Sequence, residues 1–523
     1  MVEHYLDTVG VRGSKPLPRT ISPVDFEPVK NDPSDPSVLG ARNMVLVLAL
    51  LAAAHVIVFS AALPFFNNMD EEWHLDLVSR YAQGDVPRKL EPLRPESLRC
   101  LAVYGTTEYL FPSPGGHVPT PPWKLPAAEL QARVLAYQDF RRNDMNNELA
   151  QPPLYYTLAG LWMRLWQGLG VQGAPLLYRV RFFNALAVFG MVWLGGIAAR
   201  KIFPDNRFLC LAVPALIAFM PQSVFYAINN DVLCPVVFGW VFILLLQWRE
   251  QSLTPRLAIF LGLALASVFL TKHSSLPLLA VAGGWIAQKL FRDWRRGQAS
   301  GAASLLLIGC AGLPMAAWMG WCKIHFDDFL GSGAKILVLG WTDKPVGEWL
   351  NHPIFTREGC VYFLASNLST FWQGELDWGE LMLGNANVDC AYWVLTSGFL
   401  VLTLCACLRP ASSLAPAQRA ALGFSFACVA AVVAFLALLS IKYDFHSCPY
   451  PSRAHPFFTS GRLMLGMLIP FMILFACGLD QMLGKMPPRT RFLALSALLA
   501  FMLGSEITID WNVFQSQYNW FHL

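Results

Sequence analysis

The sequence predicts an all-α polytopic membrane protein. Of its 523 residues, 55% are hydrophobic and only 14% are charged, whereas soluble proteins carry roughly 25% charged residues. Uncharged apolar stretches recur along nearly the whole chain. This pattern excludes an ordinary cytosolic enzyme, a disordered chain and a small scaffold held by disulfides. The net charge of +4 is small, and no basic patch indicates a nucleic-acid partner.

The amino-terminal segment is the first element. Residues 1–42 are polar and rich in proline, and we expect them to form a disordered cytosolic leader. The apolar run at 44–65 follows this long leader and lacks the short core of a cleavable signal. We therefore interpret it as a membrane anchor.

The membrane spans come next. A helix needs roughly 17–25 apolar residues to cross the hydrocarbon core. Eight stretches meet this length: 44–65, 182–199, 208–228, 232–248, 302–322, 391–408, 420–441 and 463–479. Three shorter stretches, 257–271, 274–288 and 492–505, need flanking residues or a locally thinner bilayer to span. The sequence thus predicts about eleven transmembrane helices.

The orientation follows from basic residues, which concentrate in short cytoplasmic loops. Such residues lie in the leader and in the turns around 200–207, 249–256, 289–296, 409–419 and 485–491. The loop at 229–231 and the tail after Glu506 have none. We expect the amino end inside, the carboxyl end outside, and three large outward segments at 66–181, 323–390 and 442–461.

Residues 152–167, PPLYYTLAGLWMRLWQ, are apolar enough to suggest another span. A crossing there would reverse the charge bias of every later loop. We therefore interpret them as an interfacial helix, whose aromatic residues and Arg164 suit the headgroup level. A true span with weak topology signals is the alternative. Among the twelve cysteines, Cys100, Cys360, Cys390 and Cys448 fall in outward segments, where a disulfide could form.

Acidic residues mark two outward turns. The first outward segment opens with FNNMDEEWH, which places Asp70, Glu71 and Glu72 beside the membrane. Such a cluster can supply a base for a hydroxyl or amine, or it can be a solvated acidic cap. The turn YAINNDVL adds Asn230 and Asp231, which could hold an acceptor or a divalent ion, or simply make the turn and cap a helix.

Cations mark two other outward positions. Lys272 lies in the turn FLTKHSSLP and Arg462 begins the stretch GRLMLGMLIP. Either could bind a phosphate, Arg462 in bidentate fashion, or could simply contact lipid headgroups. Acids and cations on one membrane face together match a substrate with an anionic phosphate linker, an apolar tail and a polar reacting group. A lipid-linked sugar has these features.

These motifs resemble the GT-C superfamily of membrane glycosyltransferases. The resemblance rests on Asp70 and Glu71, on PPLYY at 152–156, on Arg181 in RVRFFNAL, on Asp231, and on the Gly461 and Arg462 pair. It is nearest to family 39, which includes protein O-mannosyltransferases and the lipid A aminoarabinose transferase, and to uncharacterised bacterial relatives. It covers about residues 44–290 and 455–483. The family's late GR is usually followed by an aromatic residue, whereas this chain has Leu463.

The resemblance implies a GT-C-like fold with a large first extracytoplasmic loop that contains juxtamembrane helices. A catalytic transmembrane module would cover 43–300, and a variable module 301–523. Asp70 would be the catalytic base, with Glu71 as its neighbour or substitute. Asp231, Asn230 and His74 would position the acceptor or a metal, while Lys272 and Arg462 would hold the donor phosphate.

The implied reaction is inverting transfer of a sugar from a polyprenyl-phosphate donor to a hydroxyl or amine of a glycan, lipid or protein acceptor. It would take place on the outer face of a bacterial cytoplasmic membrane, in cell-envelope synthesis. No cofactor is certain; a divalent cation is possible, and the metal stays unassigned. The alternatives are a transporter or flippase of a lipid-linked or anionic solute, a polysaccharide polymerase or ligase, and a non-catalytic lipid-binding protein.

Overall fold

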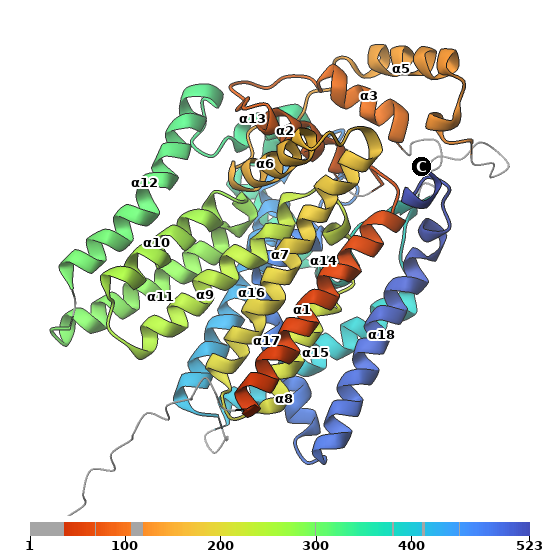
Figure 1. The fold of residues 1–523 in the computed structure, drawn as a ribbon. Coiled ribbons are helices and arrows are strands. Elements are labelled where there is room, and N and C mark those ends of the chain that lie inside the picture. Colours follow the sequence, from red (N-terminus) through yellow and green to blue (C-terminus); the bar gives the residue numbers. More distant parts are fainter. Residues whose placement is uncertain are drawn as a thin grey trace, which may run out of the picture.

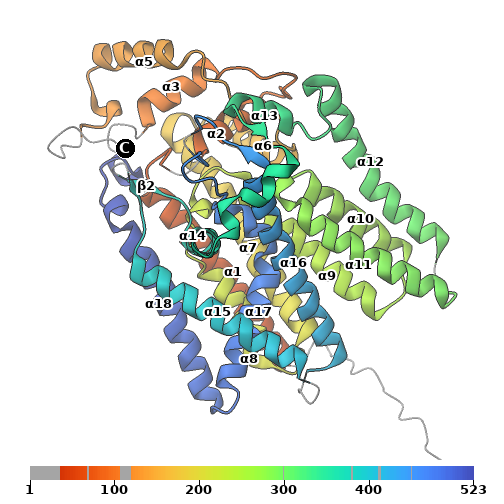
Figure 2. The same ribbon diagram turned by 180° about the vertical axis from the view of Figure 1, so that it is seen from behind.

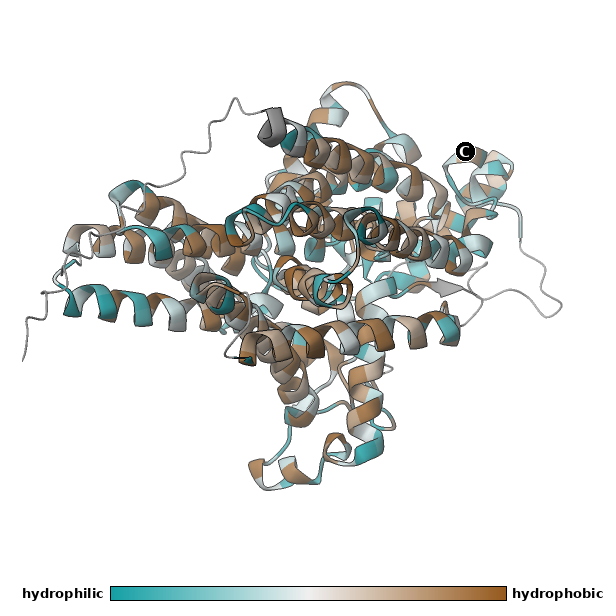
Figure 3. Ribbon diagram, turned by 90° about the horizontal axis from the view of Figure 1, so that it is seen from below, coloured by the Kyte–Doolittle hydropathy of each residue, from teal (hydrophilic) through white to brown (hydrophobic). Residues whose placement is uncertain are grey.

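The structure is a computed structural model that describes residues 36–67, 70–105, 119–298, 300–378, 381–409, 414–448 and 450–523. It is almost entirely helical, and its long helices run roughly side by side (Figure 1). Their residues are mostly hydrophobic, with hydrophilic residues gathered near the connections (Figure 3). Large apolar side chains such as Leu313 on α12 are exposed on the outside of this body, as expected of surfaces that contact lipid.

Eight helices within the described residues are long and apolar enough to cross a membrane. They are α1 (Pro36–Ala62), α7 (Gly173–Ile202), α9 (Cys234–Glu250), α12 (Gly301–Phe326), α15 (Ala386–Leu408), α16 (Pro416–Lys442), α17 (Leu468–Leu483) and α18 (Pro488–Phe514). Two of them include preceding 3₁₀ turns, η3 (Asn230–Leu233) before α9 and η7 (Gly461–Met467) before α17. Three further helices are α8 (Arg207–Ala218), α10 (Pro255–Phe269) and α11 (Leu276–Arg295). The protein is therefore an integral membrane protein of the all-α class.

A cap of shorter helices lies at one end of the long helices (Figure 1). It contains α2 (Glu71–Ala82), α3 (Pro95–Tyr104), α5 (Ala127–Arg141), α6 (Leu154–Gly168) and α13 (Ser332–Leu339). The segment predicted as an interfacial helix is α6, which packs against α2 and is not among the candidate spans. Asp70 lies at this end of the molecule.

The core helix is α17. In its candidate span 94% of the most apolar window is buried, against 17% in α12. Helices α7, α8, α9, α15 and α16 surround it, while α10, α11 and α12 lie to one side (Figure 2). Helix α14 (Arg357–Gln373) crosses the start of η7 so closely that a Cβ on Gly461 would lie 2.1 Å from the Phe371 nitrogen. Only glycine fits there.

Short elements complete the fold. The remaining 3₁₀ turns are η1 (Pro122–Lys124), η2 (Ser223–Tyr226), η4 (His273–Ser275), η5 (Val346–Asn351), η6 (Pro353–Phe355) and η8 (Trp520–His522). Two antiparallel strand pairs join β1 (Thr342–Asp343) to β4 (Tyr443–Asp444) and β2 (Asp377–Trp378) to β3 (Leu381–Met382). The β1–β4 pair ties the segment after α13 to the end of α16.

Two predicted boundaries were wrong. The stretch 208–228 is helical only to Ala218, because Pro221 lacks an N–H and restricts the residue before it. The stretch 492–505 extends into a helix of 27 residues, α18. Glu506 does not end it, since its buried carboxylate lies 3.2 Å from His55 Nε2 and accepts a hydrogen bond from Tyr226.

The leader and the cysteines also differ in part from expectation. Helix α1 begins at Pro36, inside the segment predicted as leader, and residues 1–35 lie outside the described residues. All twelve cysteines are free thiols, including Cys100, Cys360, Cys390 and Cys448. The structure therefore has no disulfide between cysteines of the outward segments.

Candidate active site

Asp70 lies at the point where the chain leaves α1 and enters α2. Its backbone adopts the left-handed conformation with φ of 63°, which costs a non-glycine residue about 1 kcal/mol or more. Its carbonyl oxygen accepts hydrogen bonds from Trp73 and His74 and so begins α2. This geometry directs the Asp70 carboxylate to Arg462, whose Nη2 donates to Oδ2 at 2.5 Å.

Arg462 is the central cation of the site. Besides Asp70, its Nε lies 3.0 Å from Glu375 Oε2, and its Nη1 lies 3.9 Å from Asp231 Oδ2. Glu375 follows α14 and also accepts a hydrogen bond from Ser460 at 2.7 Å. Three carboxylates from three distant segments thus surround one guanidinium that is only 8% exposed.

Asp231 joins Arg462 to a second cation. Its Oδ2 accepts a hydrogen bond from Lys272 Nζ at 2.7 Å, and both side chains are buried. The preceding Asn229 makes the turn, because its side-chain oxygen accepts from the Asp231 N–H at 2.9 Å. Turn formation was one interpretation of the YAINNDVL motif, and Asn229 has that role. The Asp231 carboxylate remains available to the cations.

Glu148 and Lys335 form a third ion pair on the flank of this cluster. Burial opposes both charges and is the largest single effect on each pKa, but the nearby opposite charges together outweigh it. The pKa of Glu148 is held below its ordinary value by Lys335, and the pKa of Lys335 is raised by Glu148 and then Asp70. Both side chains are thus charged at neutral pH.

We call Asp70, Glu148, Asp231, Lys272, Lys335, Glu375 and Arg462 the ion cluster. It holds four carboxylates and three cations. Burial alone would raise the pKa of Asp70, yet Arg462 and then Lys335 hold it well below its ordinary value. Glu375 behaves in the opposite way, because burial raises its pKa more than Arg462 lowers it. Asp70 and Glu375, two of the three carboxyl groups around Arg462, therefore differ in proton affinity.

His74 lies one turn of α2 beyond Asp70. Its Nδ1 shares a hydrogen bond with the Tyr156 hydroxyl at 2.7 Å. Burial lowers the pKa of His74 to about 4, against the attraction of Glu148 and Asp70, so the ring is neutral at pH 7. Among the described residues its buried Nε2 has no hydrogen-bond partner. A neutral ring held by Tyr156 is suited to hydrogen bonding with a substrate hydroxyl.

Glu71 does not join the ion cluster. Its carboxylate accepts from Arg181 Nε at 2.7 Å and Nη2 at 2.6 Å, and from the N–H groups of Phe66 and Ile228. Both charged side chains are almost fully buried. This pair ties α2 to α7 and the 228 turn, so we do not retain Glu71 as a neighbour or substitute for Asp70, the residue predicted as the base.

The other predicted residues lie close to the cluster. Asn230 donates to the Thr271 carbonyl at 3.3 Å and so joins the Asp231 turn to the Lys272 turn. Glu72, the third acid of the DEE run, points the other way and pairs with Arg141 at 2.9 Å.

No group of three or more His, Cys, Asp or Glu in the described part of the chain could hold a metal ion.

A cavity of about 210 Å³ adjoins the ion cluster. Lys272, just before η4, and Lys335 on α13 both line it, and its other walls are largely apolar, with Trp341, Phe435 and Phe458 among them. Several acceptor atoms in or beside the cluster have no hydrogen-bond partner within the described residues, namely Glu148 Oε2, Asp231 Oδ1 and Glu375 Oε1 in the cluster and Asn230 Oδ1 beside it. Buried polar atoms are rarely left unpaired, so this arrangement fits a bound polar ligand.

Sequence reasoning missed Glu148, Lys335 and Glu375. Lys335 is the one charge in the apolar run FLGSGAKILVLGW, and Glu148 stands four residues before PPLYY. Isolated charges in apolar surroundings are a usable signal. Glu375 gave no such signal in the sequence, because it lies among other acids in GELDWGE. Its position depends on Gly374, whose φ of 86° few other residues adopt.

Comparison with models of known protein families finds a family that matches this chain. Residues 54–442 match the family model described as predicted membrane protein (DUF2142). The chain belongs to the DUF2142 family. The search of curated proteins finds no match. In this DUF2142 protein the matched region includes every member of the ion cluster except Arg462.

Proposed function

We propose that this protein is an inverting glycosyltransferase, which moves a sugar from a polyprenyl-phosphate donor to a hydroxyl or amine on the extracytoplasmic face of the membrane. The observation that carries the proposal is the contact of Asp70 with Arg462 beside the Asp231–Lys272 pair. A candidate base thus lies next to cations that can stabilise a departing phosphate.

The donor would bind with its phosphate at the cations and its lipid in the adjoining cavity. Lys272 and Lys335 both line that cavity. Arg462 does not line it, but its Nη1 lies 3.9 Å from Asp231, the partner of Lys272. The apolar walls suit the first isoprenoid units next to the phosphate, since burial of apolar surface is favourable. On α13, the next residue after the lining Ile336 is Leu337, which is 77% exposed and would face lipid.

Donor binding would also activate the base. Without donor, Arg462 lowers the pKa of Asp70 and makes its carboxylate a weak proton acceptor. A phosphate that engages Arg462 competes with Asp70 for the guanidinium and adds negative charge nearby. Both effects raise the pKa of Asp70, so the base becomes effective only when the donor is present.

The reaction would then be a direct displacement. The acceptor oxygen or nitrogen attacks the anomeric carbon, the bond from that carbon to the phosphate oxygen breaks, and Asp70 takes the proton of the acceptor. Lys272 and Arg462 stabilise the charge left on the lipid phosphate. One displacement inverts the anomeric configuration. Asn230, His74 and the unpaired carboxylate oxygens can hydrogen-bond to the sugar or acceptor hydroxyls.

The direct test is product formation. The purified protein is incubated with polyprenyl-phosphate sugars and with candidate acceptors, and the products are analysed by mass spectrometry. We expect a covalent glycoside and free polyprenyl phosphate in equal amounts. If sealed vesicles take up a solute or move a lipid-linked sugar across the bilayer with no covalent product, the protein is a transporter or flippase instead.

A further inference from the structure

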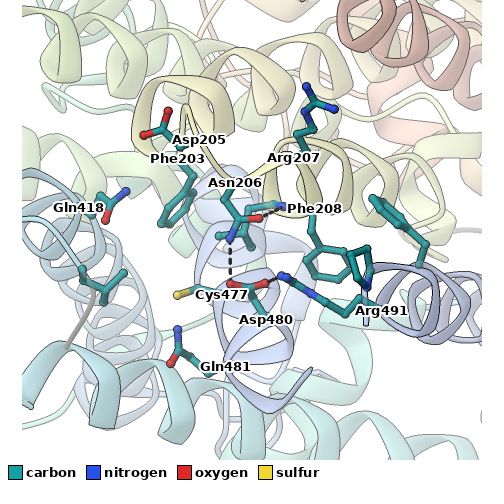
Figure 4. Close-up of a pocket in the computed structure, with 14 residues that line it drawn as sticks. Phe203, Asp205, Asn206, Arg207, Phe208, Gln418, Cys477, Asp480, Gln481 and Arg491 are labelled. Carbon is teal, nitrogen blue, oxygen red and sulfur yellow. Dashed lines mark hydrogen bonds and ion pairs between the residues drawn. The ribbon is translucent and has the colours of Figure 1, made fainter. Parts of the chain in front are cut away.

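A second cavity lies beside the start of α8, at the opposite end of the long helices from the cap (Figure 1). Figure 4 shows residues that line it. Its volume is about 770 Å³, which falls within the range of small-molecule sites. The turn between α7 and α8 lines it, together with the end of α17 and the starts of α16 and α18. Neither the family match nor the proposed transfer reaction gives this cavity a role.

The floor of the cavity is a polar network. Asp480 accepts a hydrogen bond from Asn206 Nδ2 at 3.0 Å and pairs through its other oxygen with Arg491. Asn206 is itself fixed, because its side-chain oxygen caps α8 at the Leu209 N–H. Figure 4 shows Asp480 between Asn206 and Arg491 at the centre of the site.

Arg491 retains unused binding capacity. Its guanidinium stacks on the Phe208 ring, 4.7 Å from the ring centre. Its Nε is buried and has no hydrogen-bond partner among the described residues. An unsatisfied buried donor is costly, and a phosphate oxygen is a strong acceptor for it.

Two opposite charges stand at the rim, Asp205 and Arg207, on either side of Asn206 (Figure 4). Both are exposed, and no other described residue forms an ion pair with either. The lining therefore holds two cations and two carboxylates. A balanced lining of this kind suits a ligand that is neutral overall but carries both charges.

We propose that this cavity binds the headgroup of a phospholipid with a primary amine, of the phosphatidylethanolamine class. The phosphate would contact Arg491 and Arg207, and the ammonium group would contact Asp205. A lipid is favoured over a soluble zwitterion because aromatic and aliphatic side chains, Phe203, Phe208, Leu414 and Phe492, form the remaining walls. Next to Phe492, Leu493 is 69% exposed on the outer side of α18, where acyl chains would lie. Basic residues between transmembrane helices can bind the phosphate of a lipid headgroup, a contact that Arg207 and Arg491 would supply here.

The test compares three lipids on the full-length protein. The purified protein is stripped of lipid and incubated with equal amounts of phosphatidylethanolamine, phosphatidylcholine and phosphatidylglycerol, and bound lipid is counted by native mass spectrometry. Phosphatidylcholine has the phosphate but no N–H donors, and phosphatidylglycerol has no amine. We expect phosphatidylethanolamine to be retained roughly five-fold more than either, the effect of about one added charged contact. Equal retention of the three lipids, or preference for phosphatidylglycerol, would overturn the proposal.

Rim variants locate the site without disturbing the floor. Asp205→Asn should remove the preference for the primary amine, and Arg207→Gln should lower retention of all three lipids. Arg256→Gln is the matched control, because Arg256 is an exposed arginine at the same end, at the start of α10. If the rim variants retain lipid as the control does, the cavity is not the lipid site. The readout needs no glycosyl transfer, so its failure is distinct from failure of the proposed function.

Discussion

Asp70 and Arg462 are 392 residues apart in the sequence, and their side chains meet at 2.5 Å. The same guanidinium contacts Glu375 and approaches Asp231. Arg462 thus joins the first turn after α1, the turn before α9 and the loop after α14. The candidate base and the candidate phosphate site are therefore one connected unit, and the following predictions separate their roles.

Asp70→Asn should reduce transfer by at least about a hundred-fold, because the amide cannot accept the acceptor's proton. Donor affinity should be retained or rise, since a neutral amide competes less strongly than the carboxylate with the donor phosphate for Arg462. Turnover and donor binding are measured on the same purified sample. Glu72→Gln is the control: Glu72 adjoins this site in sequence but pairs with Arg141 outside the cluster. Full activity of Asp70→Asn would move the base elsewhere.

Arg462→Lys should weaken donor binding by roughly ten-fold or more, because lysine lacks the planar fork that can hold a phosphate and two carboxylates at once. The charge is kept, so a larger effect of Arg462→Gln would separate charge from geometry. Binding of a polyprenyl phosphate without sugar gives the measurement. Unchanged affinity in both variants would remove Arg462 from the phosphate site.

Glu71→Gln should act on stability rather than on chemistry. It leaves the Arg181 guanidinium buried without its carboxylate, which typically costs about 3 kcal/mol of unfolding free energy. Glu72→Gln breaks a partly exposed pair and should cost less than about 1 kcal/mol. Thermal unfolding in detergent compares the two. Equal stability of these variants would contradict the structural role of Glu71.

Lys335→Gln should weaken donor binding several-fold, and Lys335→Arg should restore most of it. Lys335 lines the cavity beside the cluster and its charge is maintained by Glu148. Lys323→Gln is the control, because Lys323 pairs with exposed Asp327 on neighbouring α12. If Lys335→Gln and Lys323→Gln bind donor equally well, the lipid phosphate does not lie in this cavity.

His74 should make stability depend on pH. Its pKa falls from 6.5 to about 4 on folding because burial disfavours the charged ring, so below pH 6.5 the unfolded chain binds the proton more readily than the folded one. The stability that the neutral His74 ring contributes to the free energy of unfolding is fully present above pH 6.5. It is lost as the pH falls toward 4. The loss approaches about 3 kcal/mol. The free energy of unfolding of wild type and of His74→Gln is measured as a function of pH across this range. The two curves should converge at low pH, and parallel curves would contradict the prediction.

Much of the fold could be predicted because membrane helices obey a local rule. Each of the eleven expected spans has a helical counterpart, from α1 to α18, since a long apolar run can satisfy its backbone in lipid only as a helix. The errors arose where local composition misleads. A proline ended α8 early, and the charged Glu506 continued α18 because His55 and Tyr226 cover it.

The site was predictable only in part. Charges beside apolar spans stand out in the sequence and marked the DEE run, Asp231, Lys272 and Arg462. The preference for Asp70 came from the family resemblance. The sequence could not distinguish the three acids of DEE. In the structure Asp70 pairs with Arg462, Glu71 pairs with Arg181 and Glu72 pairs with Arg141. Successive residues at a helix start point in different directions, so the partner that each acid meets depends on which distant segment packs there.

The sequence by itself determined that the chain is a helical membrane protein with acids and cations concentrated in a few turns. Tertiary structure alone decided that Glu375 and Lys335, from a region with no recognisable motif, complete the cluster around Arg462. The physical reason is range. Hydrophobicity acts on each segment separately, whereas an ion pair exists only when packing brings two segments to within a few ångströms.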